Sequence, residues 1–171
     1  MSTNDQQERV KMSCWISGFT DGEGCFTVSC INNSTTKFGK QIFPEFVITQ
    51  SVKSLKALED IQTFFGVGSI VLNKRYDNHH EHLYRFCVRS VAELNEKIIP
   101  FFEEFKLKTS KHDDFLIFKK IVKVMALKEH LTESGFEKVL ALASTMNQKK
   151  KRLYNPQKPN VKTPTRSKIE F

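Results

Sequence analysis

Apolar and polar residues alternate along four short stretches of the chain, at about 25–33, 41–49, 67–76 and 82–90. A period of two indicates strands with one buried face. The second stretch is the least regular, since Pro44 disfavours a central strand and Phe43 shares a face with Glu45. The last is the clearest, with an alternation of Tyr84, Phe86 and Val88 against Arg85, Cys87 and Arg89. We therefore expect four strands, each with one polar side.

Before, between and after these strands, apolar residues recur at helical spacing. This spacing predicts helices at about 13–21 and within 51–66. Three further helices are predicted from polar residues typical of helix starts: one that Ser90-x-x-Glu93 opens and Pro100 closes, one from Ser110-x-x-Asp113 to about Lys128, and one from Ser134-x-x-Glu137 to about Gln148.

The resulting order is helix, two strands, helix, two strands, then helices. It predicts an α+β fold with an antiparallel sheet, whose apolar face packs under the helices and whose other face is polar. Along the chain we expect a flexible arm over 1–12, a single domain over 13–148, and a basic, disordered tail over 149–171.

The net charge of +8 suggests an anionic partner such as nucleic acid. Most of this charge lies in the predicted tail, where eight basic residues stand against Glu170, so the preceding 148 residues carry only about +1. The tail is compatible with a nuclear address, an arm that binds phosphates, or a solvated terminus.

Other features exclude several classes of protein. The four cysteines form no C-x-x-C pair and follow no secretory signal, which indicates reduced intracellular thiols. No apolar run approaches the roughly 20 residues of a membrane span, so we expect a soluble protein without a membrane partner. The histidines at 79, 80 and 82 lack a partner cluster, and a polar turn is favoured over a zinc site.

The segment ISGFTDGEG, residues 16–24, ends a predicted helix with two acids, although the C-terminal end of a helix disfavours negative charge. Gly18 and Gly22 share one side of that helix, where each costs roughly 1 kcal/mol relative to Ala. Close packing against another helix would offset this cost. If that helix comes from a second copy, two Glu23 carboxylates meet and would bind a cation such as Mg²⁺. On local grounds alone, a polar acidic turn between helix and strand is the favoured explanation of the segment.

Residues 16–24 also resemble, position by position, the signature of the LAGLIDADG homing endonucleases. The order αββαββα resembles the half-domain of that family, and FGVGSI (65–70) and FKLKTSKHDDF (105–115) resemble its later landmarks. The resemblance covers about 13–147 and implies a saddle-shaped, antiparallel four-stranded sheet with helices on one face, plus C-terminal helices. One copy of the signature implies a homodimer with a shared active site, acting on a long, near-palindromic duplex DNA.

The resemblance also implies roles for single residues. Glu23 and the carbonyl of Gly24 would bind Mg²⁺, for which Mn²⁺ can substitute, and Gln50 would position water. Lys108, with Lys111 as the reserve, would stabilise charge at the scissile phosphate. The helix interface between subunits would consist of Ser17, Gly18, Asp21 and Gly22.

The polar face of the sheet would bind DNA, because a two-stranded ribbon fits the major groove. Arginines would read guanine, and lysines in the hairpin turns would contact phosphates. The candidates are Thr27, Ser29, Ile31, Asn33, Lys37, Lys40, Gln41, Ser69, Asn73, Lys74, Arg75, Arg85 and Arg89.

Together these features favour a Mg²⁺-dependent, site-specific DNA endonuclease that makes a double-strand break. The alternative is a protein of the same fold that binds DNA or RNA without cleavage, such as an intron maturase, with host intron RNA as its partner, or a regulator. We expect it in an organelle (chloroplast or mitochondrion) or in the nucleus, and the sequence does not choose between them.

Overall fold

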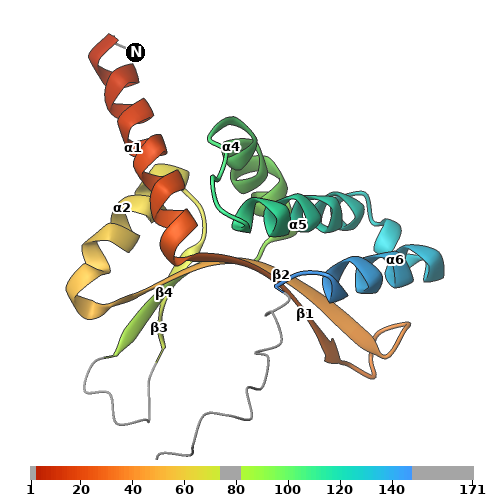
Figure 1. The fold of residues 1–171 in the computed structure, drawn as a ribbon. Helices are drawn as coiled ribbons and strands as arrows, with labels where there is room; N and C mark the ends of the chain where they lie inside the picture. The colour runs from red at the N-terminus through yellow and green to blue at the C-terminus, as the bar shows by residue number, and fades with distance from the viewer. Residues whose placement is uncertain (1–2, 74–81, 148–171) are drawn as a thin grey trace, which may run out of the picture.

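A computed structural model describes residues 3–73 and 82–147 of the 171-residue chain (Figure 1). Its main helices and strands, in chain order, are α1 Thr3–Glu23, β1 Gly24–Asn32, β2 Lys40–Ser51, α2 Leu55–Phe65, β3 Ser69–Asn73, β4 Leu83–Val88, α3 Val91–Glu93, α4 Ile99–Glu104, α5 Lys111–Ala126 and α6 Glu133–Ser144.

The four strands form one antiparallel sheet in the order β1-β2-β4-β3. Phe46, in the middle of β2, pairs with Phe26 on β1 and with Val88 on β4. The sheet curves like a saddle, with all the helices on one side (Figure 1). The α+β class and the antiparallel sheet with one helix-covered face are thus confirmed.

The core lies between the sheet and the helices and is built largely from phenylalanine. Phe26, Phe46 and Phe86 are fully buried on the helix-covered face of the strands, and Phe102 and Phe118 are fully buried opposite them. The ring of Phe26 lies 5.1–5.4 Å from the rings of Phe46, Phe102 and Phe118. Aromatic pairs at these distances contribute beyond the area they bury. The period of two in the strands therefore marks the core correctly.

The first helix is longer than predicted. It begins at Thr3, so residues 3–12, expected as a flexible arm, are helical. All of residues 3–11 are exposed, and this polar stretch has no apolar period to reveal it. The further division into a domain over 13–148 and a tail stays a prediction.

Pro100 does not end the helical segment that follows β4. Ser90 caps the helix as predicted, because its side chain accepts a hydrogen bond from the Glu93 N–H at 3.4 Å. The chain then passes through a π-helical turn, Leu94–Ile98, and continues to Glu104. Pro100 lies in the first turn of α4, where a missing N–H is tolerated. The predicted stop at Pro100 is wrong.

Two predicted helix starts also differ. Ser110 makes no capping hydrogen bond to α5. The last helix is capped by Thr132 rather than Ser134, because the Thr132 Oγ1 accepts the Gly135 N–H at 3.1 Å. Within residues 3–73 and 82–147, none of the helices combines the length and the apolar character that crossing a membrane requires.

Candidate active site and nucleic-acid interface

The junction of α1 and β1 places the two residues expected to bind metal. Glu23 is the last residue of α1 and is exposed, and Gly24, the first residue of β1, is buried. A Cβ added to Gly24 would lie 2.5 Å from Thr20 Cγ2 and 3.0 Å from Thr20 O. Real Cβ atoms do not approach other atoms so closely, so this junction requires glycine.

One side of α1, which we call its outer side, carries Cys14, Trp15, Gly18 and Gly22, all exposed. A Cβ added to Gly18 or to Gly22 would meet nothing within 4 Å. Trp15 is 41% exposed although its ring stacks on Phe19 at 5.0 Å. Packing within the described part of the chain therefore does not explain why glycine occupies these two helical positions.

The opposite side of α1, its inner side, is fastened to the segment 105–111. Ser17 is buried and donates a hydrogen bond to Phe105 O at 3.0 Å. The Asp21 carboxylate accepts hydrogen bonds from Lys108 N–H at 2.6 Å, Thr109 N–H at 3.2 Å and Thr109 Oγ1 at 2.7 Å. Ser17 and Asp21, predicted at an interface between subunits, instead bind within their own subunit, which leaves Gly18 and Gly22 on the outer side.

The hydrogen bonds to Asp21 also change its acidity. Burial alone would raise the pKa of this carboxyl, but the bonds from the backbone of Lys108 and from Thr109 outweigh it and leave the pKa below its ordinary value. Asp21 is therefore a charged acceptor that fixes the turn before α5. This contact could not be predicted from the sequence, because the partners of Asp21 lie 87 and 88 residues away.

Of the two candidate lysines, the structure brings Lys111 to the end of α1. Its Nζ donates to Thr20 O at 2.8 Å, and its side chain is half-buried. Lys108 is exposed and lines a shallow hollow beside the outer side of α1 with Cys14, Gly18 and Asp21. An ammonium group at the C-terminal end of a helix offsets the negative charge that gathers there. Lys111 thus reaches the end of the motif helix with its side chain, and the choice between Lys108 and Lys111 as the active-site lysine stays a prediction.

A second brace at this junction involves Asn147, which the sequence did not single out. Its N–H donates to Asp114 Oδ1 at 2.8 Å and its side-chain Nδ2 donates to Phe26 O at 2.8 Å. Asn147 has a positive φ of 50°, a conformation that asparagine tolerates. Burial raises the pKa of the neighbouring Cys25 thiol, so that this thiol stays protonated. The end of α6 is therefore tied to the start of β1 beside Gly24.

Gln50, expected to position water, lies near the end of β2. Ile48 pairs with Gly24, so Gln50 lies two residues beyond the start of β1, in the part of β2 next to α1. Its side chain is half-buried and follows the alternation of Phe46 and Ile48, the helix-covered side. The structure thus brings Gln50 to the region of the motif.

The helix-free face of the sheet carries most of the predicted DNA contacts. On β1 this face presents Thr27, Ser29 and Ile31, of which the last two are exposed. On β3 it presents Ser69 and Asn73, which are also exposed. None of the described helices covers this face of the sheet (Figure 1).

In the hairpin between β1 and β2, two of the predicted DNA-binding residues form hydrogen bonds within the turn. Asn33 Nδ2 donates to Gln41 Oε1 at 2.8 Å, and Asn33 Oδ1 accepts from Thr35 N–H at 3.1 Å. Asn33 and Gln41 therefore shape the turn, as asparagine commonly does. Lys37 and Lys40 are exposed at its tip. Lys74, Arg75, the histidines at 79 and 80, and the tail from 149 onward lie outside the described residues.

Both predicted guanine readers, Arg85 on β4 and Arg89 directly after it, contact a carboxylate. Glu45 on β2 accepts a hydrogen bond from Arg85 Nη2 at 3.0 Å and one from Arg89 Nε at 2.7 Å. The hydrogen bond and charge of Glu45 raise the pKa of Arg89 above its already high ordinary value. Glu45 was not predicted, because its partners follow from strand register rather than from sequence spacing.

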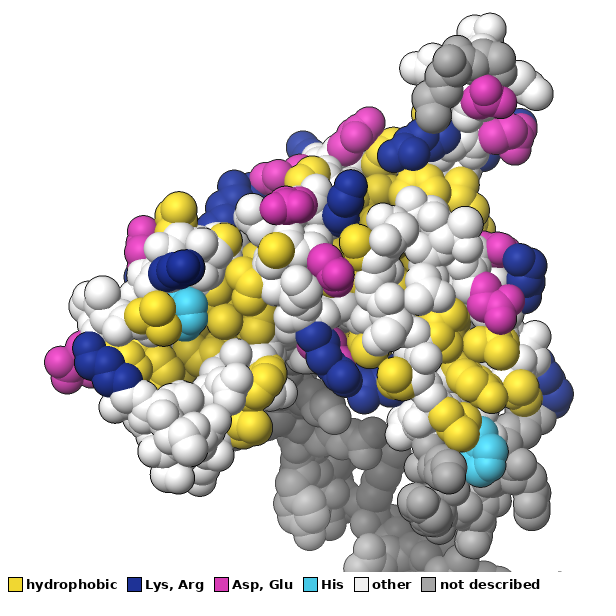
Figure 2. Space-filling model, turned by 180° about the vertical axis from the view of Figure 1, so that it is seen from behind, with side chains coloured by type: hydrophobic (Ala, Val, Ile, Leu, Met, Phe, Trp, Pro, Cys, Tyr) yellow, Lys and Arg dark blue, Asp and Glu magenta, His cyan; other side chains and the backbone are white. Residues whose placement is uncertain are grey.

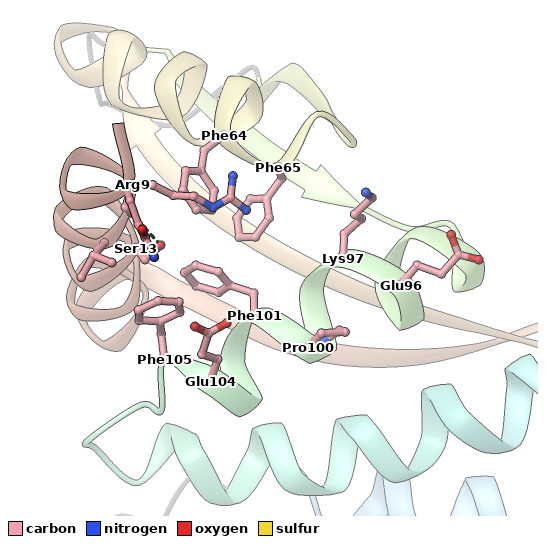
Figure 3. Close-up of a pocket in the computed structure, with 12 residues that line it drawn as sticks. Arg9, Ser13, Phe64, Phe65, Glu96, Lys97, Pro100, Phe101, Glu104 and Phe105 are labelled. Atoms are coloured by element: carbon pink, nitrogen blue, oxygen red, sulfur yellow. Dashed lines mark hydrogen bonds between the residues drawn. The ribbon is translucent and has the colours of Figure 1, made fainter. Parts of the chain in front are cut away.

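Two larger hollows lie on the helix side of the molecule. The first, of about 530 Å³, separates α1 from α2 and α4, and there the Arg9 guanidinium lies 5.1 Å from the centre of the Phe64 ring (Figure 3). The second lies beside the β1–β2 hairpin, α5 and α6 and is lined by both hydrophobic and polar side chains (Figure 2). Neither is lined by Glu23, Gly24 or Lys111.

Comparison with known proteins gives a consistent result. Residues 16–122 match the family model described as LAGLIDADG endonuclease. A Neurospora crassa protein named probable intron-encoded endonuclease 2 is 32% identical over 132 residues. That match covers 77% of this chain but 26% of the relative, so the chain spans about a quarter of the length of this curated relative.

Solved structures are similar over most of the chain. The homing endonuclease I-TnaI is 40% identical with a TM-score of 0.70, covering 79% of this chain and 87% of that one. The structure of I-SmaMI bound to an uncleaved DNA target in the presence of calcium ions is 38% identical with a TM-score of 0.72. That similarity covers 79% of this chain and 44% of I-SmaMI.

Proposed function

Because the chain belongs to the LAGLIDADG endonuclease family, we propose that it is a site-specific DNA endonuclease whose active site forms where two copies of α1 meet. I-SmaMI, which is similar in sequence and fold, has been solved on uncleaved and on cleaved DNA. Several relatives are named as intron-encoded, and we propose the same genetic setting for this chain. Its place in an organelle or the nucleus stays a prediction.

The observation that carries this proposal is the outer side of α1. Gly18 and Gly22 are exposed with open space around them, and Glu23 follows at the end of the same helix. Small residues four apart let two helices approach closely. In a two-fold symmetric pair the same patch meets itself, so the two Glu23 residues come together. In a single copy, no described residue packs against these two glycines closely enough to require them.

The residues at this junction fit a shared divalent cation. Glu23 supplies a carboxylate, and Gly24, whose position only glycine can occupy, supplies a backbone carbonyl. Both are hard oxygen donors of the kind that Mg²⁺ prefers. Within residues 3–73 and 82–147, no group of three His, Cys, Asp or Glu side chains could hold a metal. In this proposal, a second subunit supplies further donors to the ion.

Each residue around the junction then has a defined task. A bound Mg²⁺ would supply a polarised water and stabilise the leaving oxygen in phosphodiester hydrolysis. Glu23 would hold the ion, and Lys111 would place positive charge beside it, where negative charge on the scissile phosphate develops. Asp21 and Asn147 would keep α1, α5 and β1 aligned through their hydrogen bonds.

The helix-free face would bind duplex DNA. Its polar strands can enter the major groove, while Lys37 and Lys40 at the hairpin tip would contact phosphates. Two copies related by a two-fold axis would read a near-palindromic site.

The test is cleavage of a library of randomised duplexes by the purified protein, with Mg²⁺ or with Ca²⁺. We expect sequence-selective double-strand cleavage with Mg²⁺, and binding without cleavage with Ca²⁺. Selective binding without cleavage in any of Mg²⁺, Mn²⁺ or Ca²⁺ would instead identify a binding protein of this fold. Failure to bind any duplex selectively would overturn the proposal.

A further inference from the structure

One carboxylate stands among the basic residues of the helix-free face. Glu45 lies on β2, and its two oxygens bind different arginines: Oε2 accepts from Arg85 Nη2 at 3.0 Å and Oε1 from Arg89 Nε at 2.7 Å. The Glu45 side chain is only 15% exposed, whereas those of Arg85 and Arg89 are 30% and 55% exposed. The carboxylate is thus enclosed, and the two guanidinium groups border on solvent.

The strand register gives this cluster its shape. Arg85 lies on β4 and Arg89 directly follows the last residue of that strand, so the two are four residues apart on the same face, with Cys87 between them. Cys87 pairs with Val47 across the strands, and both are almost fully buried, 2% and 6% exposed, on a face that no helix covers. Their position among Arg85, Arg89 and Glu45 gives the three charged side chains a small apolar floor.

The contact changes what the two arginines can do. A free arginine on a DNA-binding face can swing to the nearest phosphate and bind it whatever the sequence. An arginine held by a carboxylate loses that freedom and keeps a fixed planar fork, which is the requirement for bidentate contact with guanine. Within residues 3–73 and 82–147, Glu45 engages only Nη2 of Arg85 and only Nε of Arg89, and the other guanidinium nitrogens make no hydrogen bond. Both can therefore still donate to a base while bound to Glu45.

The negative charge of Glu45 also favours selectivity over general affinity for DNA. The enclosed carboxylate neutralises one of the two cations and also repels phosphate, so the cluster gives up non-specific attraction. Preorganisation lowers the cost of ordering two long side chains when the correct base arrives. The arrangement therefore exchanges general affinity for selectivity.

We propose that Glu45 is a specificity-determining positioning residue, which holds Arg85 and Arg89 as a rigid pair of base readers on the helix-free face. This inference rests on the proposed function, because it requires that this face binds duplex DNA.

The test compares variants on the target selected by the wild-type protein and on all its single base-pair changes. Glu45→Gln removes the charge with little change of shape, and Glu45→Asp keeps the charge on a side chain too short to reach both arginines. For both variants we expect selectivity at the base pairs read by β4 to fall about tenfold, the scale of one lost bidentate contact. Affinity for random-sequence DNA should rise for Glu45→Gln and stay close to wild type for Glu45→Asp.

Glu103→Gln is the matched control, because Glu103 also pairs with a cation, Lys119, but on the helix side. This variant should keep the wild-type base preferences. Thermal unfolding of each variant separates a loss of fold from a loss of selectivity. In an Arg85→Ala, Arg89→Ala background, Glu45→Gln should have no further effect on selectivity.

The outcomes separate this inference from the proposed function. If the wild type binds its site selectively and folded Glu45→Gln keeps the same base preferences, Glu45 does not position the readers and only this inference fails. If Glu45→Gln binds all duplexes more tightly with unchanged selectivity, Glu45 acts through charge alone and the inference is again wrong. If the wild type shows no selective binding, the proposed function itself fails.

Discussion

The two sides of α1 differ in the contacts that they make. The inner side is fastened at every turn near its end, by Ser17 to Phe105 O, by Lys111 to Thr20 O and by Asp21 to the turn at 108–109. The outer side, with Gly18 and Gly22, is exposed and meets nothing within 4 Å of an added Cβ. Glycine within a helix costs stability, so we propose that the side which carries two of them serves a contact beyond this subunit.

The difference also explains the acids at the end of the helix. Asp21 points inward and is satisfied by three hydrogen bonds, so it belongs to the fold of one subunit. Glu23 is exposed at the end of the helix and is available to a ligand. Two acids two residues apart therefore have different tasks, structural for Asp21 and chemical, as we propose, for Glu23.

The largest effect is expected from Glu23→Gln, which removes the carboxylate from the proposed metal site. Cleavage of the selected duplex should fall by at least about 1000-fold, the scale seen when a group essential to the transition state is lost. Binding to the same duplex should change by less than about threefold. Single-turnover cleavage and a binding titration measure the two. Glu59→Gln, an exposed acid on α2, should cleave normally. A Glu23→Gln protein that cleaves at the wild-type rate would exclude Glu23 from the chemistry.

The two glycines on either side of Glu23 should respond in opposite ways to alanine. Gly24→Ala should lower the free energy of unfolding by about 2 kcal/mol, because its Cβ would overlap Thr20. Gly22→Ala should leave a single subunit unchanged or up to about 1 kcal/mol more stable, because its Cβ enters open space in a helix. Urea unfolding at concentrations that keep the chain monomeric measures both. Equal losses for the two variants would contradict the contrast between the sides.

Asp21→Ala tests the inner side by removing an acceptor of three hydrogen bonds. Because these bonds lie near the surface, where water can replace part of them, we expect a loss of about 1–2 kcal/mol in unfolding free energy. Asp113→Ala is the control, since Asp113 is exposed on α5. A loss as small as that of the control would mean that Asp21 does not fasten the turn.

The smallest effect concerns acid pH. The pKa of Asp21 is lower in the folded chain than its ordinary value of 3.8. The stability it contributes is therefore complete above the unfolded pKa and is lost as the pH falls through the folded pKa. Asp21→Asn cannot titrate, so its unfolding free energy should decline less steeply below about pH 4 than that of the wild type. Parallel curves from urea titrations at a series of pH values would contradict this.

Much of the fold could be predicted from the sequence. The period of two in β1 and β4 and the helical spacing in α2 reflect burial against one core, and burial leaves a local pattern. The start of α1 at Thr3 could not be found, because residues 3–11 are polar and exposed on all sides. Pro100 was misread because a π-helical turn before it lets the helix continue.

The candidate site was predictable where it is local and not where it depends on distant contacts. The segment 16–24 places Glu23 and Gly24 together by sequence alone. The hydrogen bonds from Lys108 to Asp21, from Lys111 to Thr20 and from Asn147 to Phe26 join residues that are 87 to 121 positions apart. Glu45 joins two arginines 40 and 44 residues away through the register of β2 and β4. Such pairings follow from tertiary packing, which a single sequence does not reveal.

The most direct test of the central claim is the number of chains on one duplex. Sedimentation of the protein with its labelled target should give two wild-type chains per cleavable duplex. Gly18→Leu should fold, because its side chain enters open space, yet it should bind as a single chain and fail to cleave both strands. Ala141→Leu, which places the same leucine side chain at an exposed position of α6, should behave as the wild type. One wild-type chain that cleaves both strands alone would contradict a site shared between two copies of α1.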